Sequence, residues 1–179
     1  LYLIIATIPG ALAGVLFEQY AAGVLRHPLS IAFTLSFFGV LLYFSDRTSQ
    51  KNKEVREMNL TDCIVIGLSQ AFAIIPGVSR SGITITGAMF RNLNREEAAK
   101  FSFLLGAPLI AGAGVFEARH LDPTAVMSVP FLAGVATSAV FAFLAIKFLL
   151  KFVRKSSYTV FVVYRLALAV IITALYLIR

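Results

Sequence analysis

The chain has 179 residues, of which 59% are hydrophobic and 14% charged, and its mean hydropathy is +0.85. Soluble domains are about 45–50% apolar and about 25% charged, so this composition excludes a conventional soluble domain, a disordered chain and a collagen-like repeat. The net charge of +7 in so apolar a chain favours basic residues that orient an integral membrane protein over a nucleic-acid binder.

Charge-poor apolar runs predict about five transmembrane helices in an all-α membrane protein, because a bilayer needs about 20 apolar residues and no series of segments alternates with a period of two. In chain order the spans are Leu1–Phe17, Pro28–Ser45, Phe101–Phe116, Ala125–Ile146 and Tyr158–Ile178. Arg165 interrupts the last span, where we expect a role in helix packing, or snorkelling to the cytoplasmic face, rather than catalysis. The first span begins without Met and already apolar, so we expect residues 1–179 to be a single membrane domain that is incomplete at the N-terminus.

The connections between the spans differ in their basic residues. Three of them, Asp46–Asn59, Arg91–Lys100 and Lys147–Lys155, carry three or four Lys or Arg each, whereas Glu18–His27 and Ala118–Pro123 carry one each. The positive-inside rule places the first three in the cytoplasm and the other two outside. The spans then alternate in direction, and the C-terminus is predicted to lie outside.

The apolar stretch 60–91 lies between two basic connections, so it enters and leaves on the same side. Two full crossings satisfy this charge pattern, but Ser81–Phe90 forms only about 15 Å of helix, half of a core of about 30 Å. We therefore predict a re-entrant helical hairpin, with Leu60–Ile75 descending, Pro76–Ser81 at the tip and Gly82–Phe90 returning. Irregular backbone at that depth is tolerated only inside protein or beside a wet cavity, so we place the functional site at the tip.

A phosphate site is predicted at this tip, which reads Pro76-Gly77-Val78-Ser79-Arg80-Ser81-Gly82-Ile83-Thr84. Ser79 or Ser81 is a natural N-cap for the returning helix, whose N-terminus attracts anions. Arg80 adds a permanent charge, and Thr84, four residues on, shares its helical face, so its hydroxyl can reach the same ligand. The alternative is a helix kink whose arginine snorkels or neutralises a buried carboxylate. Three hydroxyls around one intramembrane arginine favour the phosphate site.

Other polar residues have structural explanations. His27 and His120 are expected at the outer interface, where solvated histidines are commoner than proton relays. Asp62 lies in the first turn of a helix, where a carboxylate complements the helix dipole. Glu96 and Glu97 are adjacent, so they point to different helical faces beside a basic connection, and acid–base catalysis by this pair is not expected.

The tip motif PGVSRSGITITGA, together with the segment Asn94–Pro108, resembles the second signature of the undecaprenyl-diphosphate phosphatase family, also called the bacitracin-resistance family. Ile5–Gly10 and the pair Tyr164-Arg165 resemble it too. The resemblance implies removal of the terminal phosphate from undecaprenyl diphosphate, which recycles the lipid carrier of cell-wall precursors at the bacterial inner membrane. By this resemblance Arg80, Ser79, Ser81 and Thr84 match the diphosphate-binding positions of the family. We therefore expect catalytic roles for Arg80, Ser79 and Thr84, and substrate binding by Ser81, Gly77, Gly82 and Arg80.

The chain departs from this family in lacking its first signature, a glutamate-rich stretch and a PxSSTGH-like loop on a second hairpin. The resemblance assigns to that signature the acid–base glutamates, a catalytic histidine and the ligands of a divalent cation, Mg or Ca. We therefore expect half of an inverted-repeat architecture, with no metal ligands and no activity in these residues alone. Gln70 lies near where the missing hairpin carries its carboxylates, and an amide cannot serve as a base.

A second function class remains open from the residues themselves. A transporter or flippase for an anionic or lipid-phosphate substrate uses the same elements, a midplane hairpin and inverted repeats. The expected partners are undecaprenyl diphosphate and membrane lipid, without nucleic acid, and a homodimer is left open.

Overall fold

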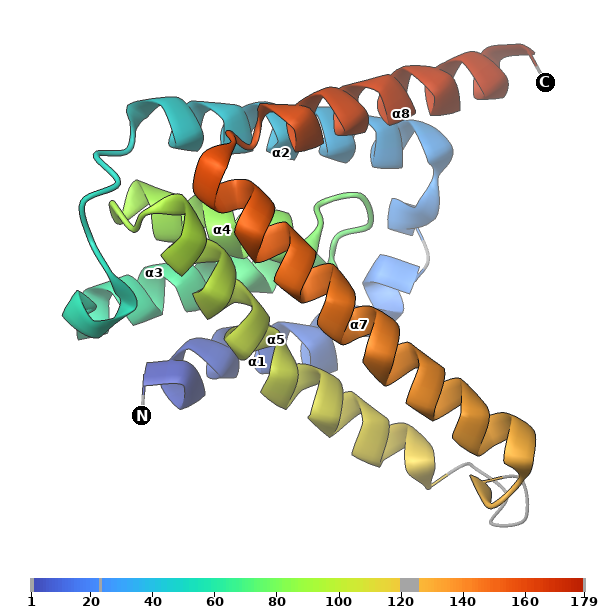
Figure 1. Cartoon of the computed structure of the whole chain (residues 1–179). Helices are drawn as coiled ribbons and strands as arrows, with labels where there is room; N and C mark the ends of the chain where they lie inside the picture. Colours follow the sequence, from blue (N-terminus) through green and yellow to red (C-terminus); the bar gives the residue numbers. More distant parts are fainter. Residues whose placement is uncertain (1, 23, 120–125, 179) are drawn as a thin grey trace.

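The computed structural model describes residues 2–22, 24–119 and 126–178, with side chains outside 18–24, and these residues form helices without a strand (Figure 1). The long helices are α1 (Tyr2–Ala22), α2 (Pro28–Thr48), α3 (Leu60–Ala71), α4 (Arg80–Phe90), α5 (Arg95–Ala118), α7 (Val129–Lys155) and α8 (Thr159–Ile178). The prediction of an all-α membrane protein is confirmed.

Four of the predicted spans match helices that are long and apolar enough to cross a bilayer, namely α2, α5, α7 and α8. The fifth corresponds to α1, whose described apolar part is the shorter stretch Tyr2–Phe17. Helices α1, α2, α5 and α7 extend beyond at least one end of their predicted spans, because they continue into polar residues outside the apolar run. Thus α5 begins at Arg95, where the Asn94 side chain accepts a hydrogen bond from the Glu97 N–H at 3.0 Å, and not at Phe101.

The largest difference concerns α7. It begins at Val129, where the Ser128 side chain accepts a hydrogen bond from the Phe131 N–H at 3.4 Å and a proline occupies the first turn. It ends at Lys155 rather than Ile146. The predicted start of this span, Ala125, lies outside the described residues.

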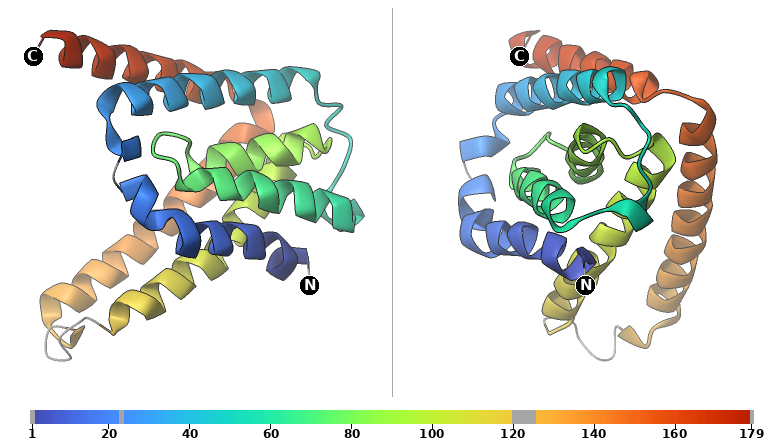
Figure 2. Two further views of the ribbon diagram at one scale, coloured as in Figure 1. Left: turned by 180° about the vertical axis from the view of Figure 1, so that it is seen from behind. Right: turned by 90° about the vertical axis from the view of Figure 1, so that its left-hand side faces the viewer.

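Helices α3 and α4 form a hairpin in the middle of the fold (Figure 2). Its arms are connected by the 3₁₀ turn Phe72–Ile74 and a short irregular tip. Helix α1 packs along α3, α2 packs against α4 and α8, and α5 packs against α4 and α7. The hairpin is therefore held by neighbours on several sides, and its re-entrant placement in a bilayer stays a prediction.

Glycines permit the closest contacts of the hairpin. A Cβ at Gly67 of α3 would lie 2.7 Å from the Ala6 carbonyl oxygen of α1, and one at Gly87 of α4 would lie 2.5 Å from the Ser69 Oγ of α3. Because a side chain does not fit at either position, small residues set the distance between these helices. Around them lies a buried apolar cluster that includes Ile66, Met89, Leu93, Phe101 and Leu105.

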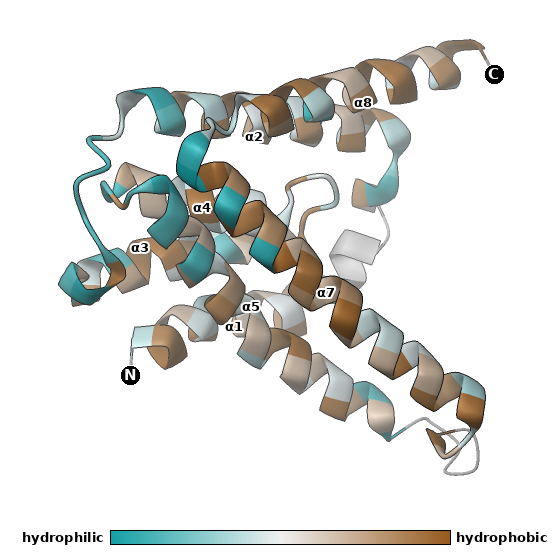
Figure 3. Cartoon of the chain, in the orientation of Figure 1, coloured by the Kyte–Doolittle hydropathy of each residue, from teal (hydrophilic) through white to brown (hydrophobic). Residues whose placement is uncertain are grey.

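Hydrophilic residues gather where the hairpin opens, at the end of α2 and the loop that follows, at the start of α5 and at the end of α7 (Figure 3). Here Asp62 accepts hydrogen bonds from Lys53 and, at 2.7 Å, from the Arg91 Nε. The Arg154 Nε of α7 donates to a Glu96 oxygen of α5 at 2.6 Å. The three basic connections predicted to share one membrane side thus lie at one end of the fold.

The opposite part of the structure presents apolar side chains outward. In Figure 1, the first half of α7 and the second half of α5 project together away from the hairpin. No residue in the most apolar part of α7 is buried, and the side chains of Phe141 and Phe148 are 71% and 69% exposed. A helix that is apolar and uncovered over this length suits a lipid environment.

Candidate active site

The tip of the hairpin places Arg80 in the first turn of α4. The helix begins at Arg80, two residues before the predicted Gly82, because the Ser79 Oγ accepts a hydrogen bond from the Gly82 N–H at 3.2 Å. Ser79, and not Ser81, is therefore the N-cap. Gly77 has a φ of +90°, and a Cβ there would lie 2.2 Å from the Thr34 Oγ1 of α2, so both the turn and the packing require glycine.

The Arg80 guanidinium has no hydrogen bond or ion pair with any side chain or carbonyl that the structure describes. It lies against α5, where a Cβ at Gly106 would be 3.8 Å from its Cζ. It borders a cavity of about 380 Å³, called here the Arg80 cavity, which is lined by Gly10, Gly14, Gln70, Ala73, Ile74, Arg80 and Leu109. No carboxylate is among these lining residues, so the alternative of a neutralised buried acid finds no support here.

Gln70 of α3 supplies the second polar group of this cavity. Its side chain is 3% exposed, its Nε2 lies 3.5 Å from the Ala6 carbonyl oxygen, and its Oε1 is buried without a partner among the described residues. A buried acceptor without a donor is costly. The Arg80 cavity is therefore lined by one permanent cation and by an amide whose oxygen is buried rather than open to the cavity.

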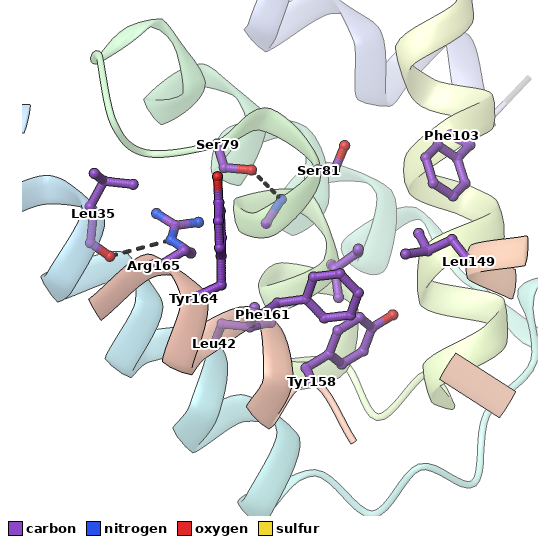
Figure 4. A pocket seen from close by; sticks show the side chains of 12 residues that line it. Leu35, Leu42, Ser79, Ser81, Phe103, Leu149, Tyr158, Phe161, Tyr164 and Arg165 are labelled. Carbon is purple, nitrogen blue, oxygen red and sulfur yellow. Dashed lines mark hydrogen bonds between the residues drawn. The ribbon is translucent and has the colours of Figure 1, made fainter. Parts of the chain in front are cut away.

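The serines of the tip face a different cavity, which Figure 4 shows. This cavity of about 310 Å³, called here the Arg165 cavity, is lined by Leu35, Leu42, Ser79, Ser81, Gly82, Ile85, Phe103, Leu149, Tyr158, Phe161, Tyr164 and Arg165. Arg80 is not among these residues, so the structure separates it from the two serines. The first turn of α4 borders both cavities, with Arg80 in the lining of one and Ser81 and Gly82 in the lining of the other.

Thr84 lies in the contact between α4 and α5 rather than in either cavity lining. It is 1% exposed, its hydroxyl donates to the Arg80 carbonyl at 2.9 Å, and it shares a hydrogen bond of 2.6 Å with the Ser102 hydroxyl. The helical spacing did place Thr84 one turn after Arg80. The structure does not bring its hydroxyl to the Arg80 guanidinium, and the catalytic role stays a prediction.

Other polar residues discussed above take part in hydrogen bonds that stabilise the fold, as expected. Asp62 closes a capping box with Asn59, and Glu97 accepts from the Lys100 Nζ at 2.7 Å. The His27 Nε2 lies 3.1 Å from the Tyr176 hydroxyl at an exposed position, and His120 lies outside the described residues.

The tip also depends on Arg165, which the sequence suggested only as a packing or snorkelling residue. Its side chain is 6% exposed, and its Nη2 donates to the carbonyls of Gly77 and Val78, both at 2.8 Å. Arg165 therefore points to the tip and does not snorkel, whereas the expected packing role is confirmed. The signal that could have found this contact is a charge about two turns inside an apolar span.

A divalent cation does not fit the residues of this site. The structure contains no group of three His, Cys, Asp or Glu that could hold a metal ion, within the ranges it describes. The Arg80 cavity offers one amide oxygen, from Gln70, beside a guanidinium that repels cations. The chemistry available at the tip itself is therefore the binding of an anion.

Comparison with known proteins identifies the family of the chain. Residues 1–171 match the family model described as bacitracin resistance protein BacA. The chain is 49% identical over 178 residues to an undecaprenyl-diphosphatase of Moorella thermoacetica, covering 99% of this chain and 68% of the relative. It is 49% identical to one of Pelotomaculum thermopropionicum and 47% identical to one of Elusimicrobium minutum, covering 97% and 95% of this chain and 66% and 65% of the relatives. The chain thus spans about two thirds of their length, and it belongs to the bacitracin resistance protein BacA family.

Proposed function

We propose that this chain carries the diphosphate-binding half of an undecaprenyl-diphosphate phosphatase, which hydrolyses the lipid diphosphate to undecaprenyl phosphate and inorganic phosphate. The observation that carries the proposal is the Arg80 guanidinium, which has no protein partner in the described residues and borders a cavity at the N-terminus of α4. The relatives named as undecaprenyl-diphosphatases support the same substrate.

The chemistry of the tip is neutralisation of charge. Hydrolysis breaks the bond between the bridging oxygen and the terminal phosphorus while a water oxygen bonds to that phosphorus, and charge spreads over the phosphoryl oxygens in the transition state. Arg80 and the N-terminal N–H groups of α4 stabilise that charge, because they are already oriented by the helix. We infer that the base that activates water, and the ligands of any divalent cation, come from residues other than those described here.

The test is substitution of Arg80 in the intact protein, with release of phosphate from undecaprenyl diphosphate as the readout. Loss of one donor to a developing oxyanion costs about 10²–10³-fold in kcat, so we expect Arg80→Ala to lower kcat by at least that factor. Arg80→Lys keeps the charge without the planar fork and should retain part of the activity. Arg56→Ala is the matched control, because Arg56 has 79% of its side chain exposed and lies in the polar loop. Turnover by Arg80→Ala at the control rate would overturn the proposal.

We also propose that the protein lies in the bacterial plasma membrane. In this orientation the hairpin opens to the cytoplasm and the C-terminus lies outside. The support is the gathering of three basic connections at the end where the hairpin opens. A cysteine introduced at Leu177, on the exposed end of α8, should react with an impermeant thiol reagent added to whole cells. Labelling only after the membrane is opened would contradict this orientation.

A further inference from the structure

Arg165 attaches the tip of the hairpin to two other helices. Its Nη2 donates to the carbonyls of Gly77 and Val78, and its Nε donates to the Leu35 carbonyl of α2 at 3.3 Å. Figure 4 shows the guanidinium of α8 lying between Leu35 and the tip. Arg165 is only 6% exposed, and no carboxylate pairs with it in the described part of the chain. A buried charge that serves only carbonyls is costly for packing alone, which points to a role in function.

The backbone that Arg165 holds is strained. Ser79 has φ +68° and ψ 112°, a conformation that a residue with a side chain adopts at a cost in free energy and keeps only when its surroundings enforce it. Arg165 binds the Val78 carbonyl, in the peptide just before Ser79. On the other side of the turn, the Thr34 Oγ1 donates to the Pro76 carbonyl at 2.7 Å. Three consecutive carbonyls are thus held by two side chains from α2 and α8.

This strained residue determines where α4 begins. Ser79 is the N-cap, so its conformation sets the direction of the first N–H groups of α4 and of Arg80 in the first turn. We propose that Arg165 is a positioning residue, which holds the tip carbonyls so that Arg80 and the N-terminus of α4 face the phosphoryl group. This inference rests on the proposed function. Arg165 acts through the tip, since it lines a different cavity from that of Arg80.

Gly82 provides independent support for this role. A Cβ on Gly82 would lie 2.7 Å from the Arg165 Nη1, closer than side-chain atoms approach one another. The missing side chain at Gly82 is therefore what lets the guanidinium lie against the first turn of α4. An alanine at this position should displace Arg165 first, since the next nearest atom, the Ser79 Oγ, lies 3.2 Å from that Cβ.

The experiment measures kcat and KM for release of phosphate from undecaprenyl diphosphate by the intact protein, per folded molecule. A misplacement of about 1 Å costs on the order of 10²-fold, so Arg165→Ala should lower kcat between about tenfold and a hundredfold, with KM changed less than about threefold. Arg165→Lys should recover part of the loss, and Arg154→Lys, at an exposed ion pair, should match the unaltered protein. A purely packing role predicts less folded protein with unchanged kcat per folded molecule, and that result would overturn the proposal.

A double-mutant cycle separates positioning by Arg165 from direct substrate contact by Gly82. Gly82→Ala should lower kcat about tenfold in the unaltered protein and less than about twofold in the Arg165→Ala background, because the displaced group is then absent. Equal losses in both backgrounds would refute the coupling. If Arg165→Ala does not fold, Thr34→Val and Arg165→Lys remain as probes, and unchanged kcat in both would refute the role. Arg80→Ala in the same assay tests the proposed function separately: if it is inactive while Arg165→Ala is fully active, only this inference fails.

Discussion

The carboxylate of Asp46 connects three parts of the chain at the polar end of the fold, and its removal should destabilise the protein strongly. Asp46 is 2% exposed, and its Oδ1 accepts from the Arg95 Nε of α5 at 2.6 Å. Its Oδ2 accepts from the backbone N–H of Tyr158, just before α8, at 3.0 Å. Asp46→Ala therefore removes the acceptor of one guanidinium and of one buried backbone donor.

The two losses can be estimated separately. Breaking a fully buried ion pair costs about 3–5 kcal/mol. Because the Arg95 side chain is 30% exposed and can be hydrated, we expect loss of this pair to lower the free energy of unfolding by only about 1–2 kcal/mol. The unpaired N–H of Tyr158 adds about 1–3 kcal/mol. We expect Asp46→Ala to lower the free energy of unfolding by about 3 kcal/mol, and Asp46→Asn, which keeps an acceptor for Tyr158, by about 1 kcal/mol.

The assay uses Cys63, the one cysteine of the chain, which is fully buried in α3. A fluorogenic maleimide reacts with its thiol only when the protein unfolds, so heating in detergent gives Tm. At about 2–4 °C per kcal/mol for a chain of this size, Asp46→Ala should lower Tm by about 6–12 °C. The control is Arg56→Ala, at an exposed ion pair, which should leave Tm unchanged. If Asp46→Ala shifts Tm no more than this control, the carboxylate does not hold the three segments together.

Two further substitutions test packing and hydrogen bonding with the same thiol readout. Gly67→Ala places a Cβ 2.7 Å from the Ala6 backbone oxygen and should destabilise by about 1–3 kcal/mol, whereas Gly112→Ala, which meets nothing within 4 Å, should be neutral or stabilising by up to about 1 kcal/mol. Similar effects of the two would argue against close packing of α1 on α3. Tyr158→Phe removes a hydrogen bond of 2.9 Å to the Arg95 carbonyl and keeps the ring, so a loss of about 1 kcal/mol is expected. No loss of stability would mean that this hydroxyl is equally well satisfied by water.

The helices and the hairpin were predictable because they depend on local pattern. Apolar runs place α2, α5, α7 and α8 correctly to within several residues at each end, and the motif around Arg80 marks the tip. The boundaries differ because a cap decides where a helix begins, as Asn94 does before the apolar run of α5 and Ser128 does inside the run predicted for α7. These features involve neighbours a few residues apart, whose interactions the chain order states directly.

The arrangement of the site was not predictable in the same way. Helical spacing puts Thr84 on the face of Arg80, yet the hydroxyl of Thr84 is taken by Ser102 of α5. The tip motif places Ser79 and Arg80 side by side, yet they border different cavities because α1 and α3 lie on one side and α2 and α8 on the other.

The sequence by itself determined the class of protein, the helices, the tip motif and Arg80 as the cation that could bind a phosphate. Only the tertiary structure decided which groups remain unpaired and which hold the tip. Arg165 donates to Gly77 across 88 positions of the chain, and Gln70 meets Ala6 across 64. The physical reason is that helix packing determines which partner a side chain meets. Packing brings together residues that are far apart in the sequence, and no periodic pattern in the sequence indicates which of them will be in contact.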